Sequence, residues 1–350
     1  MKLIVVNYSM SPSNLLFSHQ VETVFALAKY FETVHVFTHE TYSGTLPGNV
    51  KVSHLSWKKD SNTRNALTIF KVLLPVIVKN RRAILFSHMT EVPSALLSPF
   101  TWILRMRHIL WYAHATNSRY LVWSSFFVSA IVSSTHGSCR LKFNRKKIKF
   151  INQGINPQDF AFQKSSITRL KRLFYYGRLD QSKNIIQMVE LLKILNSKFN
   201  SFEIHIYGPQ TPTPYLEHVK ALITSNALSD YIVFHQPILR RMIPEVAENY
   251  GTFLNLSTGS LDKTLIETTF LGIPVITWNK EYCSQFGSWS KQPVNQTLDF
   301  ILSEIRSLSL LNSEELNSEV VKRLGIASES HSFTSWVSRL VETLVMSQKK

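Results

Sequence analysis

One stretch of the sequence, residues 253–277, constrains the fold more than any other. It begins with the apolar run 253–256, which predicts a buried strand, and continues into a loop of small polar residues. Residues 262–264 can start a helix, Gly272 can end it, and the apolar residues 275–276 predict a second strand. A strand, a polar loop, a helix and a second strand in this order form one unit of a parallel α/β layer.

The start of this predicted helix also indicates an anion site. The first amide groups of a helix have no partner within the helix, so they attract phosphate when a small-residue loop leads into them. Glu267 would lie about one turn further in, where its carboxylate can accept hydrogen bonds from sugar hydroxyls near that phosphate. We therefore expect a nucleotide-sugar site at this stretch.

The length and the charge distribution predict two domains that differ in net charge. A chain of 350 residues with 44% hydrophobic residues predicts two globular domains. Of the net charge of +16, residues 1–165 carry +14, with 20 Lys and Arg against 6 Asp and Glu, and residues 166–350 carry +2, with 19 against 17. The basic first half is expected to meet something acidic, namely a membrane surface, a phospholipid-linked acceptor or nucleic acid.

Several features predict a cytoplasmic protein. The apolar run at the N-terminus is short and interrupted by Asn7, unlike a signal peptide. No window reaches about 18 uncharged apolar residues, so no transmembrane helix is expected. The two cysteines, Cys139 and Cys283, lack metal-ligand or CxxC spacing and are expected to be reduced thiols.

The first half predicts a doubly wound parallel sheet. A strand at 2–8, a helix at about 16–31 and a strand at 34–37 follow one another, and the first turn lacks the GxGxxG pattern of dinucleotide-binding sheets. Strands predicted at 83–88 and 108–114 both end in a histidine, and the carboxyl ends of parallel strands share the edge where ligands bind. The polar residues after the first strand, including Ser13, Asn14, Ser18, His19 and Gln20, belong to the same edge. Helix capping and structural histidines remain the alternatives, and no metal site is expected.

Two apolar segments with basic ends, 64–82 and 93–107, are expected to pack on this sheet. Their cations suit an anionic membrane surface as a second role; these are Lys71, Lys79, Arg81, Arg82, Arg105 and Arg107. Nucleic acid is the less favoured partner, because no recognised motif and no alternation of aromatic and basic residues is present.

The second half repeats the α/β pattern after a polar linker at 163–171. A strand at 172–176 is followed by the loop 177–184, and further strands are expected at 202–207 and 231–234 before the stretch 253–277. The sequence thus predicts an α/β protein of two facing doubly wound Rossmann-like domains, 1–165 and 166–350, with the last helix packing back on the first domain.

Residues 177–184, GRLDQSKN, resemble the GRLxxxKN motif of GT-B glycosyltransferases of the group 1 type, glycosyltransferase family 4, and the resemblance covers nearly the whole chain. It implies that Arg178 and Lys183 neutralise the diphosphate of a nucleotide-sugar donor. This agrees with the chemistry, because a departing diphosphate gains charge that paired Arg donors and a Lys point charge stabilise. Gly177 and Gly208 would allow the backbone to approach the ligand.

The family's E-x7-E pattern is matched only in part. Glu267 fills its second position, which implies contact with the ribose hydroxyls, whereas Gly259 stands at the first, so Asp262 or Lys263 is expected to replace the missing acid. A plain helix N-cap is the alternative role of Asp262. The resemblance implies a donor site made of Gly177, Arg178, Lys183, Gly208, His235, Gly259, Ser260, Leu261, Asp262, Lys263, Thr264 and Glu267.

In the first half, residues 111–114 resemble the family's strand end whose histidine lies beside the anomeric carbon, which implies a catalytic role for His114. The acceptor side would be formed by Ser13, Asn14, His19 and His88. The resemblance implies metal-independent, cofactor-free transfer from a UDP- or GDP-sugar, with retention, to a glycan or a polyprenyl- or other lipid-linked acceptor. The expected context is cell-surface polysaccharide or glycolipid synthesis. The alternative, favoured by Gly259, is a non-catalytic sugar-nucleotide-binding or scaffold subunit.

Overall fold

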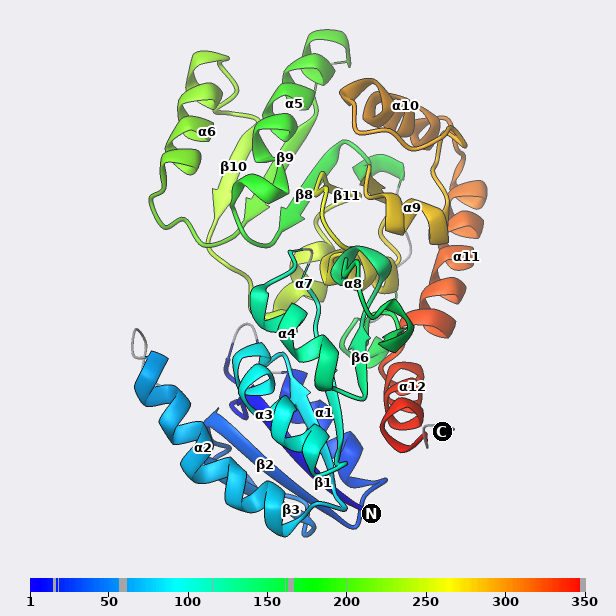
Figure 1. Cartoon of the computed structure of the whole chain (residues 1–350). Helices are drawn as coiled ribbons and strands as arrows, with labels where there is room; N and C mark the ends of the chain where they lie inside the picture. Colours follow the sequence, from blue (N-terminus) through cyan, green and yellow to red (C-terminus); the bar gives the residue numbers. More distant parts are fainter. Residues whose placement is uncertain are drawn as a thin grey trace. The chain divides into compact units, whose positions relative to one another are not determined.

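The computed structural model describes residues 1–14, 17, 19–56, 62–114, 116–160, 162, 167–199 and 201–346. The chain forms two compact units: unit 1 contains Met1–Asn152 and Thr334–Lys350, and unit 2 contains Gln153–Phe333. The chain therefore passes between the units twice. The sequence placed the division at residue 165, within a linker whose residues 163–166 lie outside the described part of the chain. Each unit is described separately below (Figure 1).

Unit 1 is built on a seven-stranded parallel sheet with the strand order β3-β2-β1-β4-β5-β6-β7. Its strands are β1 (Lys2–Ser9), β2 (Thr33–Glu40), β3 (Val50–His54), β4 (Ile84–His88), β5 (Arg107–Trp111), β6 (Ala130–Ser133) and β7 (Ile148–Phe150). All five residues of β4 are buried, because helices cover both faces of a parallel sheet and each side chain must then be apolar or paired.

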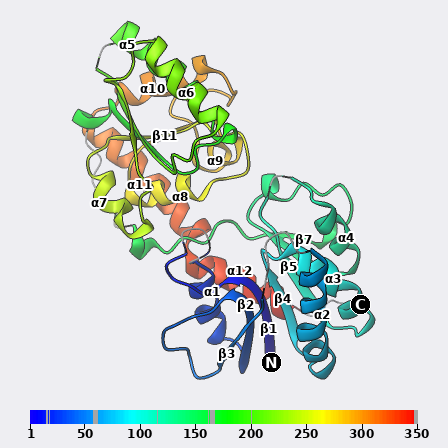
Figure 2. The ribbon, with the colours of Figure 1, turned by 90° about the vertical axis from the view of Figure 1, so that its left-hand side faces the viewer.

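The helices of unit 1 follow from the order of its strands. The chain moves outward from β1 to β2 and β3, and then returns to β4, β5 and β6 on the other side of β1. Because parallel crossovers are right-handed, α1 covers one face of the sheet and α2, α3 and α4 cover the other (Figure 2). These helices are α1 (His19–Ala28), α2 (Asn62–Lys79), α3 (Glu91–Ile103) and α4 (Arg119–Phe127).

The C-terminal helix α12 (Phe333–Val345) belongs to unit 1 from Thr334 onward. The Trp336 ring lies 5.2 Å from that of Trp111, and Arg107 Nη2 donates to the carbonyl oxygen of Thr343 at 2.7 Å. Arg107 is thus half-buried, and this burial lowers the pKa of its guanidinium. One of the cations assigned to a membrane surface, Arg107, thus binds the end of α12 within unit 1, and the membrane role of the group stays a prediction.

Unit 2 contains a five-stranded parallel sheet with the order β10-β9-β8-β11-β12. Its strands are β8 (Arg172–Tyr176), β9 (Glu203–Tyr207), β10 (Ile232–His235), β11 (Thr252–Asn255) and β12 (Val275–Thr277), and its α-helices are α5 (Ile185–Phe199), α6 (Pro214–Ser225), α7 (Ile243–Ala247), α8 (Lys263–Leu271), α9 (Lys280–Phe286), α10 (Leu298–Ser309) and α11 (Ser313–His331). The chain leaves β8 toward β9 and returns on its other side at β11. The loops after β8 and β11 diverge there, and in open α/β sheets ligands bind at this switch point.

The stretch 253–277 forms β11, a loop, α8 and β12, which confirms the predicted α/β unit. Gly272 ends α8 in the left-handed conformation, with φ of 78°, and β12 begins after Pro274. Phe253 packs edge-on against Phe174 of β8, with 5.2 Å between ring centroids, so β11 is anchored at the centre of the sheet. The predicted fold class, α/β with two doubly wound parallel sheets, is confirmed. Across the described residues, no helix has the length and apolarity needed to span a membrane.

Candidate active site

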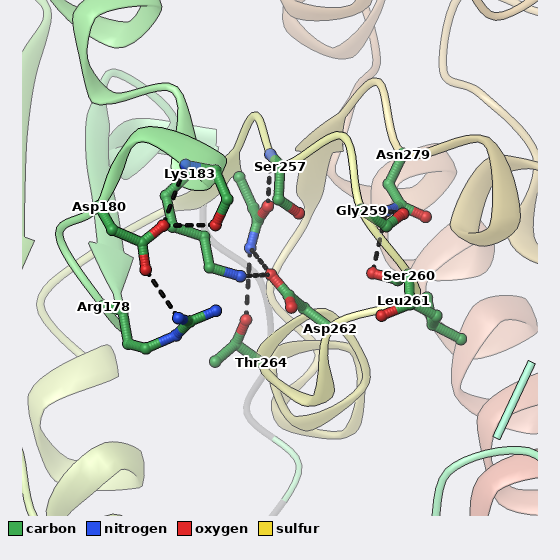
Figure 3. A network of polar contacts seen from close by, with 12 residues as sticks. Arg178, Asp180, Lys183, Ser257, Gly259, Ser260, Leu261, Asp262, Thr264 and Asn279 are labelled. Atoms are coloured by element: carbon green, nitrogen blue, oxygen red, sulfur yellow. Dashed lines mark hydrogen bonds and ion pairs between the residues drawn. The ribbon is translucent and has the colours of Figure 1, made fainter. Parts of the chain in front are cut away.

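The loops after β8 and β11 meet at the switch point of unit 2 (Figure 3). Asn184, the last residue of the GRLDQSKN loop, adopts the left-handed conformation with φ of 53°. Its Nδ2 donates to the carbonyl oxygen of Leu256 at 2.8 Å, and Trp278 Nε1 donates to the same oxygen at 2.6 Å. Because asparagine tolerates this backbone conformation, one residue both turns the first loop into α5 and ties it to the second.

Two glycines allow the turns after β8 and β9 to pack closely. Gly177 has φ of 150°, and a Cβ there would lie 2.7 Å from the Tyr175 hydroxyl. A Cβ on Gly208 would lie 2.4 Å from the carbonyl oxygen of Gly177, so only glycine fits without movement of the backbone. The structure gives both glycines a packing role, and their approach to a ligand stays a prediction.

Lys183 and Asp262 form a largely buried ion pair across the two loops. Lys183 Nζ lies 2.6 Å from Asp262 Oδ2, and the two side chains are 9% and 24% exposed. Asp262 also accepts a hydrogen bond from Asn255 Nδ2 at 3.4 Å. Asp262 occupies the N-cap position of α8, but its carboxylate makes no capping hydrogen bond to that helix. Asp262 therefore stands at the N-cap position, but its carboxylate pairs with Lys183 instead of capping the helix.

Arg178 is the accessible cation of this site. Its side chain is 65% exposed, and Nη1 lies 2.8 Å from Asp180 Oδ2. Burial works against ionisation of Asp180, but hydrogen bonds from Ser182 and the charge of Arg178 outweigh it and lower the pKa of Asp180. An exposed pair of this kind contributes little to stability, so the guanidinium can change partner at small cost.

Glu267 lies in the second turn of α8 and is buried. Its Oε2 accepts a hydrogen bond from the Tyr176 hydroxyl at 3.2 Å, and its Oε1 lies 3.5 Å from Arg240 Nε. Burial raises the pKa of Glu267, while the charges of Arg240 and Lys263 act in the opposite direction. The carboxylate is therefore held in place by a strand residue and an arginine that the sequence motifs did not identify.

The loop between β11 and α8 is held by α9. Asn279 Nδ2 donates to the carbonyl oxygens of Gly259 and Ser260 at 3.3 and 3.4 Å, and Leu261 N donates to Glu281 Oε2 at 2.8 Å. Leu261 is buried, so its side chain anchors the loop in the core. A Cβ on Gly259 would meet no atom within 4 Å, so packing does not require glycine at this position.

The first residues of α8 are Lys263 and Thr264, and Thr264 Oγ1 accepts from Asn255 Nδ2 at 3.3 Å.

His235 lies at the end of β10, the outer strand of the sheet and two strands from β8. Its ring stacks on that of Tyr207 at 4.4 Å, and burial lowers its pKa. Its carbonyl oxygen accepts a hydrogen bond from Gly208 N at 3.3 Å. His235 is thus the predicted donor residue that lies furthest from the switch point along the sheet.

The predicted residues of unit 1 lie at the carboxyl edge of its sheet. His88 is the last residue of β4 and is buried, with its ring 5.8 Å from that of His19. β5 ends at Trp111, so His114 lies in the following loop, where it is exposed; the prediction of a strand to residue 114 is wrong. Because β4 and β5 are neighbours, both histidines still belong to one edge.

The loop after β1 is only partly described, because residues 15, 16 and 18 lie outside the described residues. Ser13 Oγ lies 2.9 Å from Ser11 Oγ, and Asn14 Nδ2 donates to Glu40 Oε2 at 2.8 Å. Gln20 Oε1 accepts from the backbone of Tyr8 and Ser9. A cavity of about 170 Å³ opens beside this edge, lined in part by Tyr8, His39, Leu55, Met89 and Glu91.

Several proteins of known structure have the same fold as this chain. No protein-family model matches the sequence, and no curated protein matches it significantly. A glycosyltransferase from Rickettsia africae superposes with a TM-score of 0.75 at 14% identity, over 99% of both chains. Anabaena HepE in complex with UDP gives 0.72 at 13% identity, over 98% of this chain and 99% of that one, and sucrose-phosphate synthase from Thermosynechococcus elongatus gives 0.70 at 12%, over 97% of both.

The chain has the GT-B fold of these glycosyltransferases. In this GT-B fold, the structure pairs Lys183 with Asp262 across the loops after β8 and β11, with Arg178 in the first loop and Glu267 in the second turn of the helix that follows the second. Sequence reasoning missed the residues that hold them, which are Asn255, Tyr176, Arg240 and Asn279. Asn255 gave one usable signal, because a polar residue that ends an otherwise apolar strand often faces a site. Within the described ranges, no group of three or more His, Cys, Asp or Glu side chains is arranged to bind a metal ion.

Proposed function

We propose that this protein is a retaining glycosyltransferase that moves a sugar from a nucleoside diphosphate sugar to a glycan or lipid-linked acceptor without a metal ion. The observation that carries the proposal is the ion pair of Lys183 with Asp262, which joins the loop that holds Arg178 to the start of the helix that holds Glu267, at the switch point of a GT-B fold. Anabaena HepE, which shares this fold, has been solved with UDP and with UDP-glucose. This supports a UDP-sugar as the first donor to test, with a GDP-sugar as the second.

The ion pair between Lys183 and Asp262 supports a diphosphate at this place. A cation that is 9% exposed needs an anion beside it, and Asp262 supplies that anion. A donor diphosphate would bring further negative charge to the same ammonium group. Arg178 is exposed and can turn its planar guanidinium to a phosphate, where two parallel hydrogen bonds form.

Glu267 is proposed to accept hydrogen bonds from the ribose hydroxyls of the donor. Tyr176 donates to one of its oxygens. Burial disfavours the ionised carboxylate and raises its pKa, and a ribose hydroxyl that donates to it would offset part of that cost. The role agrees with its place one turn inside α8, behind the helix start.

In the proposed reaction, the bond between the anomeric carbon and the diphosphate oxygen breaks, and the diphosphate leaves with the electron pair. The acceptor oxygen forms its bond to the same face of that carbon, and its proton passes to the departing diphosphate. Arg178 and Lys183 stabilise the charge that grows on the leaving group. His114 is proposed to lie beside the anomeric carbon, and Ser13, Asn14, His19 and His88 on the acceptor side. Synthesis of cell-surface polysaccharide or glycolipid at the cytoplasmic membrane face is the proposed setting.

A donor screen by thermal shift tests the proposal first, since a ligand that binds only the folded chain raises its melting temperature. The nucleotide sugar that raises it most is then used with an acceptor panel to measure transfer. Arg178→Ala and Lys183→Ala should reduce transfer by about 10²- to 10³-fold, and Lys193→Ala, on the exposed surface of α5, serves as the matched control. Full activity in both site variants would rule the proposal out.

A non-catalytic sugar-nucleotide-binding or scaffold subunit is the second candidate, because Gly259 takes the place of an acid although nothing in the packing requires glycine there. Donor binding without turnover over the whole acceptor panel would favour this candidate. Turnover of any donor by the wild-type chain would eliminate it.

A further inference from the structure

Unit 1 exposes a group of large apolar side chains on the layer formed by α3 and α4. We call Phe100, Trp102, Ile103, Trp123 and Phe126 the aromatic patch. Trp102 is 61% and Trp123 52% exposed, whereas the other described tryptophans, Trp111, Trp278, Trp289 and Trp336, are all buried. Exposed tryptophans are costly in water, and their concentration on two neighbouring helices indicates a surface that contacts something else.

The two tryptophans of the patch are connected, because their rings share a neighbour. The Phe127 ring centroid lies 6.1 Å from that of Trp102 and 5.1 Å from that of Trp123. Trp123 Nε1 donates to the carbonyl oxygen of Ala95 in α3 at 3.1 Å, which fixes the orientation of its ring. The two tryptophans therefore come from different helices but are held on one surface.

A basic loop joins the patch at the end of α4. Lys147 Nζ donates to the carbonyl oxygens of Ser125 and Phe126 at 2.9 and 3.0 Å, and Asn144 Nδ2 donates to Ser125 Oγ at 3.0 Å. These contacts hold residues 142–147 against the last turn of α4. Three exposed cations, Lys142, Arg145 and Lys146, and the exposed ring of Phe143 come from this loop.

The charge of this region is almost entirely of one sign. Residues 62–158 contain 14 Lys and Arg and one acid, Glu91. Glu91 begins α3 and its Oε2 accepts from Ser118 Oγ at 2.5 Å, whereas Trp102 and Ile103 lie at the other end of that helix. At a rise of about 1.5 Å per residue, the two ends of α3 are roughly 18 Å apart. Trp102 and Ile103 thus lie far from the acid of this segment, whereas Trp123, which is hydrogen-bonded to Ala95, lies about one helical turn from Glu91, whose carboxylate is occupied by Ser118.

We propose that the aromatic patch and the loop 142–147 dock on an anionic phospholipid bilayer, with the tryptophan and phenylalanine rings at the headgroup level. Tryptophan is favoured at that depth because its ring system is large and apolar with one polar N–H edge. The N–H of Trp123 is hydrogen-bonded to Ala95, so this ring would contribute its apolar area. The cations attract the negative surface of the bilayer. A second copy of this chain is a poor occupant, because two faces with the same excess of positive charge repel each other.

Vesicle flotation of the full chain tests the proposal, with vesicles of pure phosphatidylcholine and of phosphatidylcholine containing phosphatidylglycerol. We expect binding only to the anionic vesicles, and a decrease as salt is raised. Lys142→Glu/Lys146→Glu should weaken vesicle binding at least about tenfold. Trp102→Ser/Trp123→Ser should also weaken it about tenfold, and this loss should vary less with salt concentration than the loss in the charge variant. The matched controls are Lys193→Glu/Lys198→Glu and Phe199→Ser, which alter exposed residues of α5 and should bind as wild type does.

Three outcomes overturn the proposal: no binding to anionic vesicles at low salt, equal binding to neutral vesicles, or loss in the charge variants without any loss in the tryptophan variants. The last result would indicate a general polyanion site, such as one for RNA. Thermal stabilisation by UDP is measured on every variant and should remain at the wild-type level. This measurement separates the docking surface from the proposed donor site, so that either can fail alone.

Discussion

The two units differ in how their charged residues are paired. At the switch point of unit 2, charges are paired within the chain: Lys183 with Asp262, Arg178 with Asp180, and Glu267 with Arg240. In unit 1, residues 62–152 contain 14 cations and one acid. Buried ions require partners, whereas exposed ions are stabilised by water and remain available to external anions. Unit 2 therefore pairs the charges at its switch point within the chain, whereas this segment of unit 1 carries an excess of positive charge.

The largest effect is expected from Lys183→Met, which removes the buried cation of unit 2. Transfer should fall by about 10²- to 10³-fold, because one preorganised charge that stabilises the leaving group is lost. The measurement is kcat/KM with the best donor.

Asp262→Asn is the opposing variant. It removes the charge that pairs with Lys183, so UDP should bind to this variant at least as tightly as to wild type. Weaker UDP binding in Asp262→Asn would show that the pair does not act as a replaceable counter-ion.

Glu267→Gln should raise KM for the donor by about 10- to 100-fold, the range for loss of a charged hydrogen-bond acceptor.

The same variant tests the pKa of the buried Glu267 carboxyl. Because the folded-state pKa of Glu267 is raised, the folded chain binds more protons than the unfolded chain between the two pKa values. This residue therefore lowers the free energy of unfolding as pH rises through that interval. The difference in melting temperature between wild type and Glu267→Gln should shift in favour of the variant as pH rises above the ordinary range of a carboxyl group; a difference that does not change with pH would contradict the assignment.

The histidines of unit 1 provide a smaller test. His114 is exposed, so His114→Ala should reduce kcat/KM about tenfold and leave the melting temperature nearly unchanged. His88 is buried among aromatic rings, so His88→Ala should lower the free energy of unfolding by about 2 kcal/mol. Urea denaturation with activity assays at a stable temperature separates the two effects. A loss of stability in His114→Ala equal to that in His88→Ala would contradict the placement of His114 in the loop.

The smallest change in stability is expected from Gly259→Glu. The site of its Cβ is open, so the free energy of unfolding should change by less than about 0.5 kcal/mol. The new carboxylate would restore the acid of the E-x7-E pattern, and we expect it to change the order of preference among donor sugars. Gly208→Ala is the steric contrast, because its Cβ would meet the carbonyl oxygen of Gly177. Equal destabilisation by both substitutions would show that the loop at Gly259 is less open than described.

Local patterns in the sequence were sufficient to predict much of this protein. The apolar run at 253–256, the polar loop and Gly272 specify a strand, a turn and a helix end through short-range preferences, and the structure forms β11 and α8 there. The alternation of such units predicted two doubly wound sheets, and the GRLxxxKN pattern placed Arg178 and Lys183 in one loop. These properties follow from neighbours along the chain, so they can be read without coordinates.

Other features depended on contacts between residues far apart in the sequence. Only the tertiary structure pairs Lys183 with a carboxylate 79 residues away, turns Arg107 toward Thr343 in α12, and ends β5 at Trp111 before His114. It also decides that Trp102 and Trp123 are exposed while Trp111 and Trp336 are buried. The physical reason is that burial and ion pairing are set by which surfaces meet after the sheets have formed. The amino-acid sequence by itself determined the parallel α/β units and the types of residue at their ends; the tertiary structure decided which of those residues are partners and which remain available to a ligand or a membrane.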